Sequence, residues 1–124
     1  MELTTGETSR ATGASLRQLQ HWHERGFIRI RIEGRRRLWN EAAVRKATVL
    51  ARIGTNGLQL LERVSKLPDA VFARRFFVFR ATESPYTKGR ALPRSLVAVT
   101  DDPAEVIRIS TEARHGVMLV EVPN

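Results

Sequence analysis

Cysteine is absent from this 124-residue chain, and aromatic residues make up only 6% of it. The lack of cysteine excludes disulfide bonds, thiolate metal ligands, cysteine nucleophiles and thiol redox chemistry. No apolar run is long enough to span a bilayer, and the segment from Met1 to Arg10 lacks the basic-then-apolar order of a signal peptide. The sequence therefore predicts a soluble, cytoplasmic protein that does not bind membranes.

Signatures of catalysis are missing as well. The chain has no glycine-rich phosphate loop, no nucleophile motif and no spacing typical of metal ligands. His21 and His23 are two residues apart, so on a helix they do not share a face and do not form a metal pair. Helix capping explains the adjacent carboxylates of Asp101 and Asp102. We therefore expect no catalytic residues, no metal and no cofactor, and the protein is not predicted to be an enzyme.

Positive charge is abundant, and it is concentrated in the first half of the chain. The formal net charge is +8, and residues 1–67 hold 13 basic and 6 acidic side chains against 8 and 7 in residues 68–124. A basic surface attracts polyanions. Most of the cations in the first half are arginines, which make directional, bidentate contacts with phosphate or guanine.

Two capping boxes open the chain. Thr4-Thr5-Gly6-Glu7 has the T-x-x-E form and Ser15-Leu16-Arg17-Gln18 the S-x-x-Q form, with Gly13 between them as a helix stop. Two capped helices separated by a few residues predict a helix-turn-helix.

The second helix is predicted over residues 15–25, with a buried stripe and a polar outer face. The stripe consists of Leu16, Leu19, Trp22 and His23, and the outer face of Arg17, Gln18, His21, Glu24 and Arg25. Alternating apolar and basic residues around Glu33-Gly34 then predict a β-hairpin over residues 27–39 that carries five arginines. Trp22 and Trp39 could stack on bases, but we expect both to pack in the core.

Asn40 is predicted to cap a third helix of about 14 residues, and a fourth, short helix is predicted from Leu58 to Lys66. Pro68-Asp69 marks the end of this first unit. Beyond it, residues 76–79 and 95–99 are predicted to be buried strands, separated by a loop with Pro85, Gly89 and Pro93. Asp102 caps a helix that stops at Gly116, and residues 117–122 form a last strand. The predicted fold is α+β: a winged helix-turn-helix unit over 1–67 and a small β-β-α-β unit over 68–124.

Residues 3–67 resemble the DNA-binding domain of the MerR family of bacterial regulators. The resemblance depends on an ordered set of short motifs: Thr4-Thr5-Gly6-Glu7 before Gly13-Ala14-Ser15, Leu19-Gln20-His21-Trp22 before Arg25-Gly26-Phe27, Arg37-Leu38-Trp39-Asn40, and Gly57-Leu58-Gln59-Leu60. It implies a transcription regulator that binds double-stranded DNA.

The chain departs from the family pattern in two places. Gln20 stands where the family has an arginine, a change that alters which bases are preferred because glutamine pairs with adenine. After Leu67 the family continues into a long helix that pairs two subunits, whereas this chain has Pro68 and β-like sequence.

We accordingly expect helix 15–25 to read the major groove and the arginine-rich wing to lie on the phosphate backbone. The predicted DNA-binding residues are Thr5, Ser15, Arg17, Gln18, Gln20, His21, Arg25, Arg29, Arg31, Arg35, Arg36 and Arg37. Residues 68–124 are expected to form a homodimer or, over 69–124, to bind a protein partner.

Two alternatives remain open on the sequence. One is an excisionase-like architectural factor of a mobile element, which bends DNA for a recombinase. The other is a DNA-tethered interaction module, antitoxin-like for example, in which residues 69–124 hold another protein.

Overall fold

The computed structural model describes residues 1–54, 57–82 and 92–123. Within them the chain is α+β, as the sequence predicts, with helices and two three-stranded antiparallel sheets. The helices are α1 (Thr5–Thr12), α2 (Leu16–Glu24), α3 (Glu41–Ile53), α4 (Leu58–Ser65), the 3-10 helix η2 (Asp69–Ala73) and α5 (Pro103–Glu112). The strands are β1 (Leu3–Thr4), β2 (Arg31–Glu33), β3 (Arg36–Trp39), β4 (Phe76–Thr82), β5 (Leu92–Thr100) and β6 (Val117–Glu121).

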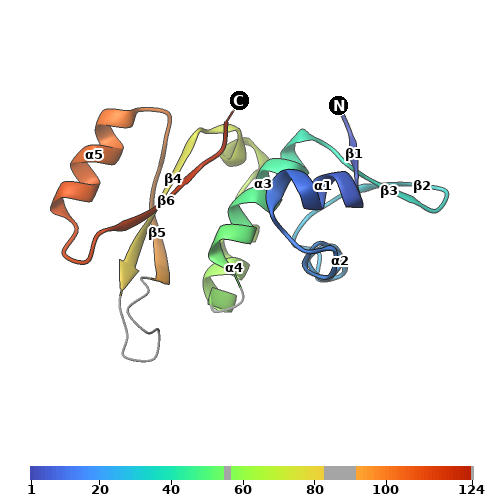
Figure 1. Cartoon of the computed structure of the whole chain (residues 1–124), viewed down its shortest axis with the longest axis horizontal. Coiled ribbons are helices and arrows are strands. Elements are labelled where there is room, and N and C mark those ends of the chain that lie inside the picture. Colours follow the sequence, from blue (N-terminus) through green and yellow to red (C-terminus); the bar gives the residue numbers. More distant parts are fainter. Residues whose placement is uncertain (55–56, 83–91, 124) are drawn as a thin grey trace.

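Figure 1 shows two halves of the molecule. The helix-turn-helix and the small sheet of β1, β2 and β3 lie on one side, and the sheet of β4, β5 and β6 lies on the other, with α5 on its outer face. The helices α3 and α4 stand between them. No helix in the described ranges is both long and apolar enough to cross a membrane.

Both predicted capping boxes are confirmed. Thr4 accepts a hydrogen bond from the Glu7 amide while the Glu7 carboxylate accepts from the Thr4 amide, and Ser15 and Gln18 make the same reciprocal pair at α2. Gly13 between the helices adopts φ +80°, a left-handed conformation that other residues rarely take. The turn of the helix-turn-helix is therefore fixed by local chemistry.

The hairpin is shorter than the predicted range 27–39. Phe27 and Ile28 are both buried, and their amides bond to the Trp22 carbonyl, so this stretch packs into the core and is not a strand. The paired strands are β2 and β3, joined by a two-residue turn in which Gly34 has φ +62°. The short strand β1, which the sequence did not indicate, pairs with β3 on its other edge.

One hydrophobic core runs through both halves of the described chain. Leu19 and Trp22 of α2 belong to the same cluster as Leu50 of α3 and as Phe77 and Phe79 of β4. The predicted core roles of both tryptophans are confirmed, because Trp22 and Trp39 are at most 3% exposed. The stripe predicted for α2 is wrong at its start, since Leu16 is 57% exposed.

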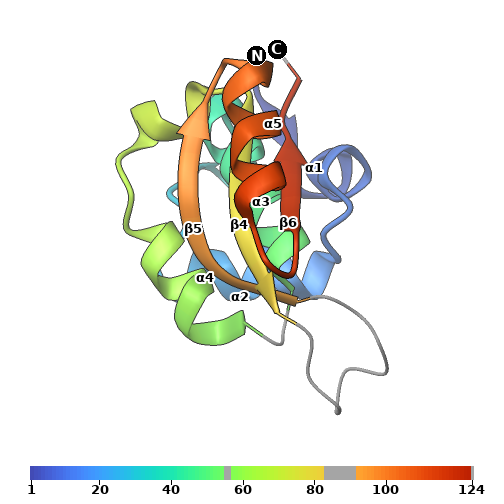
Figure 2. The same ribbon diagram turned by 90° about the vertical axis from the view of Figure 1, so that its left-hand side faces the viewer.

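The C-terminal unit is a sheet of order β5-β4-β6, which Figure 2 shows face on with α5 in front. Alternate residues of β4 face opposite ways: Phe77 and Phe79 lie toward α3, while Phe76 and Val78 pack under Val106 of α5. Two predicted details are wrong, because Pro93 lies within β5 and α5 ends at Glu112 before Gly116. Ile107 of α5 is 67% exposed. Pro85 and Gly89 lie outside the described residues.

The adjacent carboxylates have different roles, which corrects the prediction that capping explains both. Asp102 caps α5 through the Ala104 amide. Asp101 instead accepts from the Arg74 guanidinium and from the Arg75 amide, each at 2.8 Å. It therefore joins the start of β4 to the end of β5.

The two halves are also joined by a buried arginine. Arg45 of α3 is 7% exposed. Its guanidinium donates to the carbonyl oxygens of Phe72 and Arg74 before β4, and of Val122 and Pro123 after β6. One side chain of the helix-turn-helix unit thus satisfies backbone acceptors from both ends of the C-terminal unit.

We predict that Arg45→Leu lowers the free energy of unfolding by about 2–4 kcal/mol, because it leaves buried carbonyl groups without donors. Urea unfolding followed by circular dichroism measures the change. Arg52→Leu is the matched control, since Arg52 is exposed on the same helix. A loss of less than about 1 kcal/mol for Arg45→Leu would contradict the assignment.

The contacts of Asp101 predict a pH dependence. The hydrogen bond from Arg74, followed by that from the Arg75 amide, lowers the pKa of the Asp101 carboxyl. A lowered folded-state pKa stabilises the protein above the unfolded-state value, about 4, and the contribution is lost as pH falls through the folded value.

We therefore expect Asp101→Asn to destabilise the protein at neutral pH and to match wild type at strongly acidic pH. Urea unfolding at both pH values measures the difference. Glu112→Gln, which breaks an exposed pair within α5, is the control and should stay near wild type at both. A destabilisation by Asp101→Asn that does not change with pH would show that the charge of Asp101 is not what matters.

Candidate nucleic-acid interface

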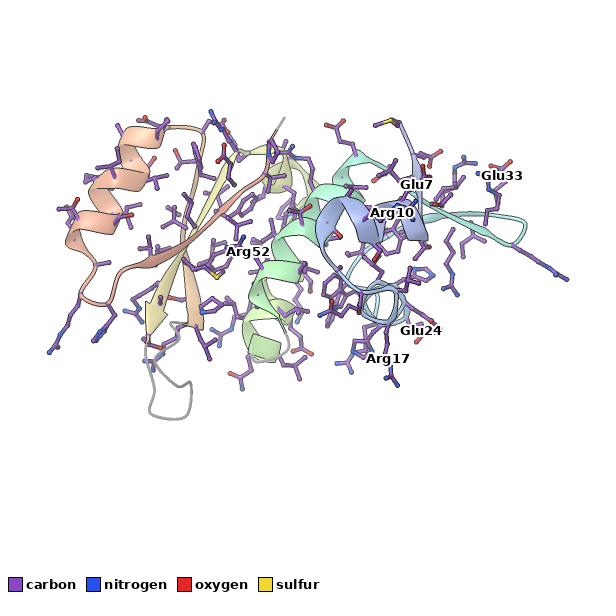
Figure 3. All side chains as sticks on the ribbon, in the orientation of Figure 1. Glu7, Arg10, Arg17, Glu24, Glu33 and Arg52 are labelled. Carbon is purple, nitrogen blue, oxygen red and sulfur yellow. The ribbon has the colours of Figure 1, made fainter. Side chains whose placement is uncertain are left out.

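The helix α2 presents a polar face to the outside. Leu19 and Trp22 fix its orientation because they are buried against the core, and this leaves Arg17, Gln20 and His21 exposed. Figure 3 shows Arg17 and Glu24 extending from α2 on the side away from α3. The polar outer face predicted for this helix is present at these positions.

Two of the predicted reading residues are engaged within the helix. The Gln18 carbonyl oxygen accepts from the Ser15 amide at 2.9 Å, and the side chain is half-buried. The Gln20 amide donates to Glu24 at 3.0 Å. Gln18 keeps only its amide group free, whereas Gln20 can exchange its exposed partner for another acceptor. Arg17 and His21 are thus the more accessible donors of this face.

The residues predicted at helix starts serve as structural contacts. The Ser15 hydroxyl accepts from the Gln18 amide at 3.0 Å. The Thr5 hydroxyl accepts from the Trp39 indole, also at 3.0 Å, and so ties α1 to β3. The first turn of a helix leaves backbone amides without partners in the helix, and anions bind favourably at such positions.

The wing divides its arginines between two faces. Opposed residues in an antiparallel pair lie on one face, and neighbours along a strand alternate. Arg31 pairs with Leu38 and Glu33 with Arg36, which places Arg31 and Arg36 on one face, while Arg37 lies on the other. Arg35 lies in the exposed turn.

Arg31 is not a free cation. Its guanidinium contacts Glu2 at 2.7 Å and Glu33 at 2.8 Å. The hydrogen bond from Arg31 lowers the pKa of the Glu2 carboxyl, so this pair stays charged at neutral pH. Among the described residues, Arg35, Arg36 and Arg37 form no ion pair. The wing therefore offers three uncompensated arginines at its tip and one that anchors the hairpin to the N-terminal segment.

The other two predicted contacts, Arg25 and Arg29, lie apart from the α2 face and the wing. They line a pocket with Lys46 and Lys66, between the ends of α2 and α4. Arg25 also pairs with Glu62 of α4 at 3.3 Å and lies over the Phe27 ring.

Two features near α2 were not predicted. A hollow of about 310 Å3 separates α2 from α4 and is lined on the α2 side by Arg17, Gln18 and His21. Leu16 and Leu58 are exposed apolar residues, at 57% and 55%. Helical periodicity assigns Leu16 to the buried stripe of α2, so the sequence carries no signal that exposes it.

No cluster of three or more metal-binding side chains occurs in the part of the chain that the structure describes. His21 is exposed and His23 half-buried, in keeping with their different directions on α2.

A comparison with known families identifies the first half. The family model for the MerR HTH family regulatory protein matches residues 3–62. The chain therefore contains a MerR-family helix-turn-helix domain. This confirms the resemblance seen in the motifs, and it indicates a DNA-binding regulator of transcription. No curated protein sequence matches the chain.

The MerR domain depends on the Ser15 cap for the start of its second helix. We predict that Ser15→Ala lowers the free energy of unfolding by about 1 kcal/mol, because the cap satisfies a free amide of α2. Thermal or urea unfolding measures this. Ser110→Ala is the matched control: its hydroxyl bonds within α5, to the Val106 carbonyl, and its loss should change stability by less than about 0.5 kcal/mol. Equal losses in the two variants would exclude a special role for Ser15.

Proposed function

We propose that the protein is a sequence-specific regulator of transcription that binds double-stranded DNA through α2 and the wing. The observation that carries the proposal is the exposed polar face of α2, inside a MerR-family domain and beside a hairpin with three uncompensated arginines. The major groove is about 12 Å wide and admits a helix of this size. The proposal includes a bacterial source, a cytoplasmic location and a function that is not enzymatic.

Base reading is assigned to α2. Arg17 can bind guanine through two hydrogen bonds, and His21 presents a further donor on the same exposed face. Gln20 can bind adenine once it leaves Glu24, and Gln18 contributes its free amide group. The helix starts at Thr5 and Ser15 are proposed to contact phosphates through their backbone amides.

Backbone contact is assigned mainly to the wing. Arg35, Arg36 and Arg37 supply positive charge that no described carboxylate neutralises, and Arg31 holds the hairpin in place. Arg25 and Arg29 add charge beside the end of α2. With four to six phosphate contacts in each subunit, the logarithm of the binding constant should fall with the logarithm of salt concentration with a slope of about −4 to −5.

We further propose that two copies pair through residues 68–124. A single α2 reads few base pairs, and two-fold pairing doubles the contact. The family's long pairing helix is replaced here by the sheet of β4, β5 and β6 with α5, on which Ile107 is 67% exposed and Val97 48%. Such a dimer binds inverted repeats. Binding of another protein through 69–124 remains the alternative use of this unit.

Selection of genomic DNA fragments by the purified protein, at about 0.15 M salt, tests the proposal. We expect one enriched motif, arranged as an inverted repeat. Direct repeats would instead favour the excisionase-like architectural factor. Equal affinity for enriched and scrambled duplexes would contradict sequence-specific binding.

Two substitutions separate reading from backbone contact. Arg17→Ala should cost about 1–3 kcal/mol at the preferred site and change the preferred bases, whereas Arg36→Ala should weaken all sequences alike and reduce the salt slope by about 1. Arg108→Ala on α5 removes one charge elsewhere and is the control. An unchanged motif and affinity for Arg17→Ala would exclude α2 as the reading element.

A further inference from the structure

A pocket lies where the end of α2, the middle of α3 and the end of α4 meet. Its volume is about 480 Å3, within the range of roughly 300–1,000 Å3 usual for small-molecule sites. Four cationic side chains from three segments line it: Arg25 and Arg29 between α2 and β2, Lys46 of α3, and Lys66 after α4. Asp69 supplies the one carboxylate among its described lining residues, so the lining carries a net charge of three positive units.

Lys46 is the unusual member of this group. It is 8% exposed, and its ammonium lies 5.4 Å from the centroid of the Phe72 ring. Among the described residues it forms no ion pair within 4 Å and donates no hydrogen bond to a side chain or carbonyl. An ammonium has three donors, and the Lys46 nitrogen reaches solvent at the pocket, because no described side-chain nitrogen or oxygen is both fully buried and without a partner. The pocket therefore contains donors that the protein itself does not satisfy.

The other cations of the pocket increase this excess of positive charge over acceptors. Arg29 and Lys66 are exposed at the pocket and also have no ion-pair partner in the described part of the chain. Burial lowers the pKa of Lys46; Asp69 opposes that shift and Arg29 adds to it. An anion in the pocket would reverse the effect of burial on Lys46 and offset the repulsion between the cations.

We propose that this pocket binds a phosphate group. Lys46 at the pocket wall and Arg29 and Lys66 at its rim can donate charge-assisted hydrogen bonds to its oxygens. Leu67 and Pro68, which also line the pocket, give the rest of the ligand an apolar surface. The burial of Lys46 favours a small phosphorylated molecule over the phosphodiester backbone of a duplex, although both carry the same chemistry. The site is independent of base reading by α2.

Titration calorimetry of the full chain with inorganic pyrophosphate, at constant ionic strength, tests the site. We expect binding by the wild type and a loss of about tenfold or more in Lys46→Met, as removal of one charge-assisted contact predicts. Methionine keeps the unbranched side chain over Phe72, which preserves the packing. Lys66→Gln, an exposed change with little effect on folding, should weaken binding several-fold.

Arg108→Gln is the charge-matched control, because it removes one positive charge from α5 outside the pocket. It should bind pyrophosphate within twofold of wild type. Thermal unfolding provides a second measurement: pyrophosphate should raise the melting temperature of the wild type and of Arg108→Gln more than that of Lys46→Met.

Binding to duplex DNA, compared across the same variants, identifies the source of the phosphate. If Lys46→Met weakens pyrophosphate binding and leaves the salt slope of DNA binding unchanged, the ligand is a small molecule. If it reduces the slope by about 1 and leaves pyrophosphate binding unchanged, the phosphate belongs to the duplex. If Lys46→Met and Arg108→Gln give equal pyrophosphate affinities and equal salt slopes, the site does not exist.

Discussion

The guanidinium of Arg45 holds the two halves of this protein together. It extends from α3, which belongs to the MerR domain. It donates to carbonyl groups that lie just before β4 and just after β6, at the two ends of the C-terminal unit. A planar group with five donors suits this task, because it can serve several carbonyls at once. The stacked rings of Phe72 and Phe77, 5.7 Å apart, fill the space beside it. The C-terminal unit is thereby attached to the same helix that supports α1 and the wing.

The surface arginines fall into two groups, those paired with a carboxylate and those without such a partner among the described residues. Arg31, Arg74 and Arg75 each meet a carboxylate at 2.8 Å or less, and each pair joins segments far apart in the sequence. Exposed pairs of this kind contribute little to stability. The Arg31 pair anchors the hairpin that carries the wing-tip arginines, and the Arg74 and Arg75 pairs join the start of β4 to the ends of β5 and β6. In this chain the paired arginines position elements, and the unpaired ones are available to a polyanion.

Local chemistry accounts for the part of the fold that could be predicted from the sequence. The boxes at Thr4 and Ser15, the proline start of α5 and the strand in residues 76–79 depend on neighbours a few residues away, and all are confirmed. The errors arise where distant packing decides. Phe27 and Ile28 alternate with arginines as a strand would, yet both enter the core.

The same distinction applies to the candidate site. Arg17 and His21 are exposed as periodicity predicts, because the helix has one buried face whatever it packs against. The contact of Arg31 with Glu2 and the burial of Arg45 and Lys46 depend on tertiary packing between segments far apart in the sequence. A basic residue on a helix is ordinarily exposed, and nothing in the sequence marks these two as exceptions.

Arg45 and Lys46 are neighbours on α3, and their surroundings explain their different chemistry. The donors of Arg45 meet carbonyl groups that the C-terminal unit supplies, so its burial completes the fold. Lys46 instead lines the pocket with Arg29 and Lys66, where Asp69 is the one carboxylate among the described lining residues. Arg25, at the end of α2, shares that pocket and divides its contacts between Glu62 and the Phe27 ring. The phosphate proposed for this pocket would supply the acceptors that Lys46 lacks, whereas Arg45 already has its acceptors within the fold.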